Sequence, residues 1–244
     1  MEIEMKAKVD NEQVSKLMKF FNKETEYLEK SDEYFSFGGV APKKPKNIIR
    51  IRKEKSAVNA PILVFPFLKF FGSSSITVEN ILTGYIRPFE KTELAKEQTW
   101  LTVKAKNTNS VGIEINEETE GQLSVDTEKA FRKSMNITNF QPYFTKFKRS
   151  FSFYVKNEDE DFEMHAELVS VNGIGPYLEI ESTIKLENEN AYSRIDTIQD
   201  LTKVNTAMDQ IKWFFKHELG ITEFDGRSWV DIIEEAEKKE FTND

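Results

Sequence analysis

The strongest constraint on the fold of this chain is a strict alternation of charged and apolar residues at its beginning. Residues 2–9 read Glu-Ile-Glu-Met-Lys-Ala-Lys-Val. In an extended strand, all of these charges lie on one face and all of the apolar side chains lie on the other. A single strand of this kind is typical of a sheet with one solvated face. Later segments repeat the arrangement, and the repetition favours a more specific interpretation.

The later segments separate positive from negative charge. Solvated strands usually mix the two signs, so segregated signs indicate that each strand supplies a particular group to a shared site. The basic pairs are Arg50 and Arg52, Lys104 and Lys106, and Lys146 and Lys148, whereas the acidic pairs are Glu114 and Glu118, with Asn116 between them, and Glu179 and Glu181.

The residue types in these pairs indicate phosphate chemistry. Lysine and arginine side chains donate hydrogen bonds without accepting them, which suits a row of phosphates. Carboxylates are hard oxygen ligands, which suit divalent cations that bridge phosphate oxygens. Phosphoryl transfer needs both kinds of group. The chain has no Gly-rich loop followed by Lys and Ser or Thr, so it is not a Walker-type nucleotide hydrolase.

Whether the charged faces point inward or outward distinguishes a barrel with a charged interior from one with an apolar interior. A lipocalin-like carrier would need apolar side chains inside. Here the predicted helices carry apolar stripes that must pack on an apolar outer wall, as in the helix after Asp10, where Gln13 completes a capping box and Val14 and Leu17 begin the stripe. We therefore expect the charges to face inward.

The composition excludes several classes of function. The chain has no cysteine and only two histidines, His165 and His217, so we expect neither a His-rich zinc site nor a Ser-His-Asp triad. We expect no catalytic role for either histidine. The formal net charge of −8 argues against a nucleic-acid partner. The longest apolar run, residues 60–71, is too short for a membrane span, and a strand from residue 2 leaves no room for a signal peptide, so we expect a cytoplasmic protein.

The order of the expected elements indicates an α+β fold, an eight-stranded antiparallel β-barrel with helices packed outside. A helix at 127–135, capped by Asp126, should precede the last strands, and helices from Asp196 to Leu219 and from Ser228 should follow them. The remaining strands are expected at 30–37, 48–54, 97–106, 110–118, 144–156, 162–171 and 177–184.

The ordered motifs resemble those of the CYTH superfamily, the triphosphate tunnel metalloenzymes. They are Glu2-x-Glu4-x-Lys6, Arg50-x-Arg52, Thr102-x-Lys104, a Glu-rich strand, a Lys/Arg strand and Glu179-x-Glu181. The superfamily includes class IV adenylate cyclases, thiamine triphosphatases and inorganic triphosphatases. The resemblance implies a single tunnel domain over residues 1–244, with an insertion at about 55–97, that uses Mg²⁺ or Mn²⁺.

The resemblance and the charge pattern together give the candidate site. Glu4 and Lys6 are assigned catalytic roles. Lys6, Lys8, Arg50, Arg52, Lys104, Lys106, Lys146, Lys148 and Arg149 are predicted to bind substrate, and Glu2, Glu4, Glu114, Glu118, Glu179 and Glu181 to hold metal.

Two positions depart from the family pattern. Asn116 stands where a second carboxylate is usual, so that Glu118 or Glu120 would have to replace it. Val169 stands where an aspartate is common, with Glu167 two residues earlier. The alternatives Lys148 and Arg149 differ by one residue, which reverses the face of the strand.

Three functions remain open at this point. The first is a metal-dependent phosphohydrolase that acts on an inorganic or organic triphosphate. The second is a class IV adenylate cyclase, which converts ATP to cyclic AMP and pyrophosphate. The third is a nucleotide- or polyphosphate-binding module without catalysis. In each case the partner is a small-molecule triphosphate or nucleotide, and a homodimer is an open alternative to a monomer.

Overall fold

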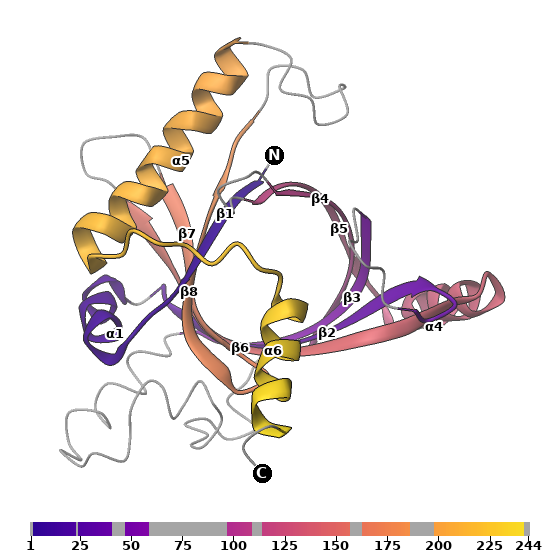
Figure 1. Ribbon diagram of the computed structural model, residues 1–244. Helices are drawn as coiled ribbons and strands as arrows, with labels where there is room; N and C mark the ends of the chain where they lie inside the picture. The colour runs from indigo at the N-terminus through magenta and orange to yellow at the C-terminus, as the bar shows by residue number, and fades with distance from the viewer. Residues whose placement is uncertain are drawn as a thin grey trace.

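The computed structural model describes residues 2–22, 24–40, 47–58, 97–108, 114–156, 163–185 and 198–241 (Figure 1). Most of the insertion predicted at about 55–97 lies outside these residues. The strands are β1 (Glu2–Lys8), β2 (Glu26–Phe37), β3 (Asn47–Val58), β4 (Gln98–Thr108), β5 (Glu114–Leu123), β6 (Phe140–Lys156), β7 (Glu163–Val171) and β8 (Ile174–Thr183). The helices are α1 (Asn11–Leu17), the 3-10 turn η1 (Met18–Phe20), α4 (Val125–Ile137), α5 (Ile198–Leu219) and α6 (Trp229–Phe241).

The eight strands form a closed antiparallel barrel in the order β1-β5-β4-β3-β2-β6-β7-β8. The ring is visible end-on in Figure 1. Its shortest seam joins β1 to β5, where pairing runs only from Glu2 opposite Asn116 to Glu4 opposite Glu114. The predicted α+β barrel with outer helices is thus confirmed.

The strand register places the charged rows on one continuous inner face. Asp32 on β2 lies opposite Arg52 on β3 and opposite Lys146 on β6. Glu179 on β8 lies opposite Lys6 on β1 and Glu167 on β7. Because side chains alternate along a strand, these pairings direct the charges of neighbouring strands into a common lumen.

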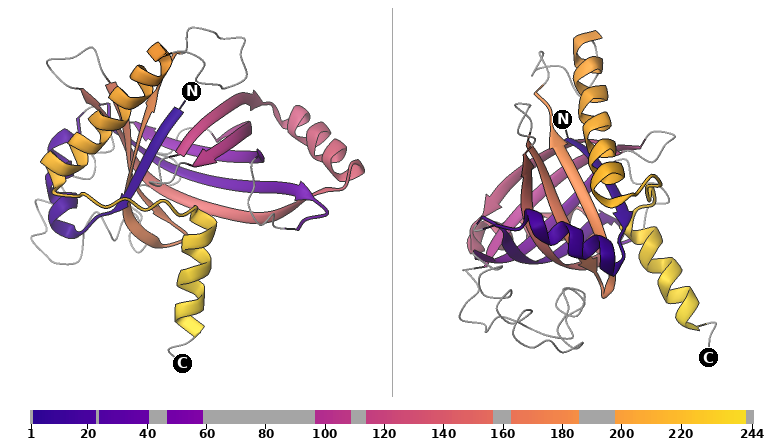
Figure 2. Two further views of the ribbon diagram at one scale, coloured as in Figure 1. Left: turned by 45° about the horizontal axis from the view of Figure 1, so that its top comes forward. Right: turned by 90° about the vertical axis from the view of Figure 1, so that its left-hand side faces the viewer.

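The largest hydrophobic core lies outside the ring, beneath α1 and α5 (Figure 2). The apolar residues that alternate with the lumen charges, such as Ile3, Met5 and Ile180, are buried there against Phe214 and Phe215 of α5. The apolar stripe of each helix therefore packs on the outer wall, as the sequence predicted.

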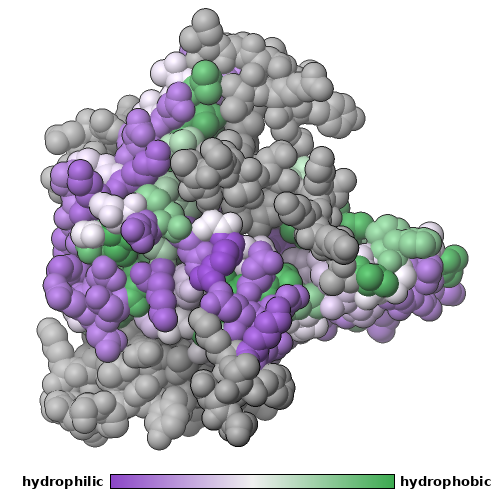
Figure 3. All heavy atoms as spheres, viewed as in Figure 1, coloured by the Kyte–Doolittle hydropathy of each residue, from purple (hydrophilic) through white to green (hydrophobic). Residues whose placement is uncertain are grey.

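Two smaller clusters complete the packing. Met135 of α4 packs with Phe35 and Ile51 at the far end of the long β2–β6 ribbon, where Figure 3 shows hydrophobic residues gathered. Ile232 and Ile233 of α6 pack against apolar residues of β7 and β8 that belong to the inner-face rows, namely Val169, Val171 and Tyr177. The helix α6 therefore packs over part of one end of the barrel, in front of the lower part of the ring in Figure 1.

The N-terminal caps of two helices can be compared with those predicted from the sequence. Asp10 and Gln13 form the predicted capping box. The predicted cap of α4 was wrong, because Ser124 rather than Asp126 accepts the hydrogen bond from the Thr127 amide. Asp126 instead lies in the first turn, where a carboxylate interacts favourably with the helix dipole. None of the described helices has the length and apolar character needed to cross a membrane.

The hydrophobic core between the barrel and the helices α1 and α5 should contribute much of the free energy of unfolding. We expect Ile180→Ala to lower the free energy of unfolding by about 2–5 kcal/mol, because it removes a fully buried side chain beneath α5. Leu201→Ala on the same helix is the control, and it should change stability by less than about 0.5 kcal/mol because Leu201 is exposed. Urea unfolding checks both, and equal effects would contradict the assignment of this face as the core.

Candidate functional site

A cationic cluster of Asp32, Arg50, Arg52 and Lys146 occupies one part of the lumen wall. Arg52 holds the fully buried Asp32 carboxylate through two hydrogen bonds, of 2.7 and 3.1 Å. The Lys146 ammonium lies 3.4 Å and the Arg50 guanidinium 3.6 Å from the same carboxylate. Three cations thus share one carboxylate, so this part of the wall favours additional negative charge.

The electrostatics of Asp32 follow from this arrangement. Burial alone would raise the pKa of the Asp32 carboxyl, but the charges of Arg52, Lys146 and Arg50 hold it well below its usual value. Asp32 therefore stays ionised, and it orients the guanidinium of Arg52 in a fixed plane.

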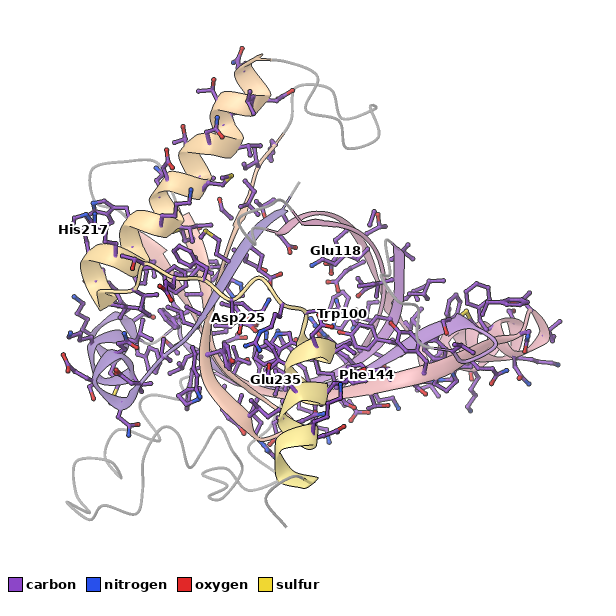
Figure 4. The ribbon with its side chains drawn as sticks, in the orientation of Figure 1. Trp100, Glu118, Phe144, His217, Asp225 and Glu235 are labelled. Atoms are coloured by element: carbon purple, nitrogen blue, oxygen red, sulfur yellow. The ribbon has the colours of Figure 1, made fainter. Side chains whose placement is uncertain are left out.

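An acidic cluster of Lys104, Glu2, Glu4 and Glu118 has the opposite composition. The Lys104 ammonium lies 3.0 Å from Glu2, 3.1 Å from Glu118 and 3.8 Å from Glu4. Figure 4 shows Glu118 within the ring of strands. Burial raises the pKa of Glu2, and the neighbouring carboxylates of Glu181 and Glu118 raise it further, against the lowering effect of Lys104. Three carboxylates therefore surround one cation.

Arg50 connects the two clusters. Its guanidinium donates to Thr102 Oγ1 at 2.9 Å and to the carboxylates of Glu118 and Glu120, each at 3.0 Å. This contact runs from β3 across β4 to β5. The cationic cluster and the acidic cluster are therefore adjacent in the lumen.

Glu167 and Glu179 form a third group with Lys30 and Lys148. Lys30 donates to Glu167 at 2.6 Å, and Lys148 contacts both Glu167 and Glu179, the latter at 2.5 Å. Trp229 of α6 also donates to Glu179, through its indole nitrogen. Burial would raise the pKa of Glu179, but Lys148 and Lys146 lower it to about 2.

A fourth group runs across β6, β7 and β8. Ser152 Oγ lies 2.7 Å from His165 Nε2, and His165 Nδ1 lies 2.7 Å from Glu181 Oε1. Burial would lower the pKa of His165, but the hydrogen bond to Glu181 and the charges of Glu167 and Glu181 raise it, with Lys30 acting in the opposite direction.

The structure brings most of the predicted site residues together. Lys6 is buried on the inner-face row of β1, whereas Lys8 is exposed at the end of that strand. The backbones of Lys106 and Glu114 lie in the ladder beside the acidic cluster, but their side chains are outside the described part of the structure. Arg149 is not brought into the lumen, because it pairs with Glu29 and its guanidinium lies over the Phe147 ring.

The sequence interpretation did not predict that carboxylates of the lumen would pair with its cations. It treated the cations as donors whose partner would be a ligand, and it assigned Glu179 to metal, whereas Asp32, Glu167 and Glu179 all pair with these cations. Asp32 and Glu167 both occupy inner-face positions of their strands, so the alternation of residues in the sequence could have predicted that they face the lumen. The contact from His165 to Ser152 had no signal in the sequence, because only the register between β6 and β7 brings them together.

A metal site is not fully formed in the described residues. No three histidine, aspartate or glutamate side chains among them converge with metal-site geometry. The carboxylates of Glu2, Glu4 and Glu118 converge on the Lys104 ammonium instead. Their donor chemistry fits a hard divalent cation, which would replace that ammonium as their partner.

The buried carboxylates should make stability dependent on pH. Because the pKa of Asp32, Glu167 and Glu179 is lowered in the folded state, their ion pairs stabilise the fold above the unfolded value of about 4. This stabilisation is lost as the pH falls from about 4 toward the native values. We expect the free energy of urea unfolding to drop between pH 5 and pH 3.

Asp32→Asn tests the origin of this loss. We expect it to destabilise the fold by about 3–5 kcal/mol at pH 7, because three buried cations lose their common partner. The further loss on acidification should be smaller than in the wild type. Asp209→Asn, on the exposed side of α5, is the matched control. If Asp32→Asn were as stable as the wild type at pH 7, the ion pairs described for this cluster would be contradicted.

Comparison with known proteins agrees with this architecture. No protein-family model and no curated protein matches the sequence. Among solved structures, the PH1819 protein from Pyrococcus horikoshii OT3 is similar over 97% of this chain and 99% of its own, with 17% identity and a TM-score of 0.59.

Two further structures carry names that describe an activity. HpAC1 from Hippeastrum, for which a dominant triphosphatase activity is stated, has 14% identity and a TM-score of 0.51 over 97% of this chain and 96% of its own. A "putative adenylate cyclase" from Vibrio parahaemolyticus has 12% identity and a TM-score of 0.53 over 96% and 97% of the two chains. At these identities the likeness establishes the fold alone, and this chain shares the fold of these three proteins.

Proposed function

We propose that the lumen binds a triphosphate together with divalent cations and hydrolyses it to release orthophosphate. The observation that carries this proposal is the separation of charge within one barrel. Three cations share the carboxylate of Asp32, and three carboxylates share the ammonium of Lys104. A surface with such opposite clusters side by side suits a polyanion bound together with metal ions.

The cationic cluster would hold the phosphates. Arg52 presents a planar guanidinium that Asp32 fixes in position, and Lys146 and Arg50 lie beside it. Because these side chains are held before the ligand arrives, little conformational entropy is lost when phosphate oxygens bind them. Their burial keeps competing water away and strengthens each charge interaction.

The acidic cluster would hold the metal. Glu2, Glu4 and Glu118 supply the oxygen donors that Mg²⁺ or Mn²⁺ prefers. A bound divalent cation supplies charge neutralisation and polarisation at the phosphate oxygens. When no divalent cation is bound, the ammonium of Lys104 lies among these carboxylates and offsets their mutual repulsion.

The names of the two compared proteins agree with a triphosphate as substrate, since one is described by a triphosphatase activity and the other by an adenylate cyclase name. Both reactions break a phosphoanhydride bond in a triphosphate. No feature of the described lumen favours a ribose hydroxyl over water as the attacking group, so cyclisation is an outcome of the assay rather than a second proposal.

The assay uses tripolyphosphate, ATP and thiamine triphosphate with Mg²⁺ or Mn²⁺, and it measures orthophosphate, pyrophosphate and cyclic AMP. Release of orthophosphate without cyclic AMP is the expected result. Cyclic AMP would identify a cyclase, and tight binding without turnover would identify a non-catalytic module. Either of these results would overturn the proposed hydrolysis.

Arg52→Ala tests the phosphate-binding role of the cationic cluster. We expect it to weaken tripolyphosphate binding about 10-fold to 100-fold, which is the effect of losing charge-assisted hydrogen bonds of about 1.5–3 kcal/mol. Arg132→Ala is the control, because Arg132 lies on α4 outside the lumen and pairs with Glu33 and Glu128. Titration calorimetry measures both. Equal losses would show that the basic residues act only as a diffuse field.

Glu4→Gln tests the metal-binding role of the acidic cluster. We expect about a 10²-fold or greater loss of the metal-activated rate, since one anionic oxygen ligand is removed, and we expect excess chelator to abolish turnover of the wild type. Glu12→Gln on the exposed face of α1 should leave the rate unchanged. Full turnover in chelator would contradict the metal requirement.

A further inference from the structure

The strands β2 and β6 continue past the barrel as a two-stranded ribbon. Their pairing runs to Phe37 opposite Phe140. The pairing of β3 with β2 ends earlier, at Phe35, and that of β7 with β6 ends at Lys148. Figures 1 and 2 show this ribbon projecting from the ring of strands, with α4 at its end. The end of the ribbon is therefore a projecting part of the molecule that no other described strand borders.

Hydrogen bonds fix the shape of this end. The Gly38 amide donates to the carbonyl oxygen of Asn139 at 2.7 Å, which joins the end of β2 to the end of α4. Ser36 Oγ donates to the carbonyl oxygen of Val40, also at 2.7 Å. Gly38 and Gly39 have φ of 69° and 67°, which glycine adopts without strain. The side chains that flank this turn are therefore held in a defined arrangement.

The most exposed large apolar side chains in the described part of the chain gather on the ribbon and on α4. They are at least 68% exposed, whereas no other large apolar side chain in the described ranges exceeds 51%, and they are Phe37, Val40, Val125 and Ile137. The Phe37 ring packs edge-on against the Phe140 ring, with 6.1 Å between their centres. Because the turn joins β2 to the end of α4, Phe37, Val40 and Ile137 form one patch, called the apolar tip below.

The sequence around the apolar tip is basic in a chain that is acidic overall. The formal net charge is −8, but residues 34–53 and 129–157 contain no aspartate or glutamate. Lys129 and Lys133 are exposed on α4, and Lys133 lies one turn before Ile137 on the same face of the helix. Further lysines follow Val40 in the sequence, namely Lys43, Lys44 and Lys46. Exposed apolar side chains and positive charge are therefore combined at the end of the ribbon.

The size and shape of the apolar tip distinguish between possible partners. A stable interface between two proteins buries about 800 Å² on each partner, over about 20–30 residues. The side chains at the end of a projecting ribbon supply much less apolar surface than this. A lipid bilayer needs no surface of complementary shape, because apolar side chains enter the boundary of the acyl chains while lysines interact with anionic headgroups.

We propose that the apolar tip and the lysines of α4 dock the protein on the surface of a membrane that contains anionic lipids. Phe37, Val40 and Ile137 enter the boundary between the headgroups and the acyl chains, and Lys129 and Lys133 interact with the headgroups. The docking surface lies outside the lumen, so the proposal does not depend on the reaction that the lumen carries out.

Sedimentation of the full chain with lipid vesicles tests the docking. One set of vesicles contains phosphatidylcholine alone, and in the other set about a third of the lipid is phosphatidylglycerol. We expect the protein to sediment with the anionic vesicles, to bind the neutral ones about 10-fold more weakly or less, and to dissociate as the salt concentration rises. Absence of binding to the anionic vesicles overturns the proposal, as does equal binding to both sets.

Variants locate the docking surface. Phe37→Ser and Ile137→Ser should each weaken binding to the anionic vesicles about 10-fold or more, the effect of losing one apolar side chain from the bilayer. Lys133→Glu should weaken it about 10-fold, because attraction to the anionic surface becomes repulsion. The matched controls are Leu201→Ser and Lys216→Glu, which replace exposed residues of α5 and should bind as the wild type. Thermal melts check that each variant is folded, and equal losses in tip and control variants overturn the proposal.

The absence of cysteine from the sequence permits a site-specific measurement of insertion. Val40→Cys and Leu201→Cys each introduce a single thiol, which is labelled with a fluorophore whose emission shifts to shorter wavelength in an apolar environment. We expect the shift on addition of anionic vesicles for the label at position 40 and no shift for the label at position 201. No shift at position 40, or an equal shift at both positions, overturns the insertion of the apolar tip.

Two further measurements on the same variants would identify a different partner. A dimer in analytical ultracentrifugation that Phe37→Ser dissociates, without vesicle binding by the wild type, would assign the apolar tip to a second copy of the chain. Binding to a soluble polyanion such as heparin that Lys133→Glu abolishes, again without vesicle binding, would assign the lysines to a polyanion in solution. Either result overturns docking on lipid. Hydrolysis of tripolyphosphate by these variants should equal that of the wild type, so failure of the docking proposal leaves the proposed function intact.

Discussion

The fold depends on how a barrel can hold a charged interior. Each lumen charge is removed from most of its water, and an unpaired buried charge costs several kcal/mol. The register meets this cost by placing opposite charges on adjacent strands, as with Asp32 beside Arg52 and Lys146, and with Glu179 beside Lys6. The hydrophobic core must then lie outside the ring, beneath α1, α4 and α5.

The ion pairs inside the lumen do not match one cation to one carboxylate. One carboxylate serves three cations around Asp32, and one ammonium serves three carboxylates around Lys104. Arg50 also pairs with Glu118 and Glu120, so the two clusters form one continuous network of opposite charges across the lumen wall. The same arrangement explains how anionic and cationic ligand groups could be separated over the width of one barrel.

The helix α6 packs on inner-face residues of β7 and β8 at one end of the barrel. Ile232 and Ile233 pack on Val169, Val171 and Tyr177, and Trp229 donates to Glu179 inside the lumen. The side chain of Val169 therefore serves the packing of this helix, and the buried carboxylate of that strand is Glu167, two residues earlier on the same face. Glu167 lies next to Lys30 and Lys148, and opposite Ser152 in the strand ladder.

The sequence by itself determined the strands, the inward direction of the charges and most of the lumen residues, because period-2 alternation is a local property that fixes which side chains share a face. It did not determine which charges would meet. The pairing of Asp32 with three cations, the placement of Arg149 outside the lumen and the contact of His165 with Ser152 all depend on register between strands distant in the sequence. A shift of one residue reverses a face, so only the tertiary structure could decide these contacts.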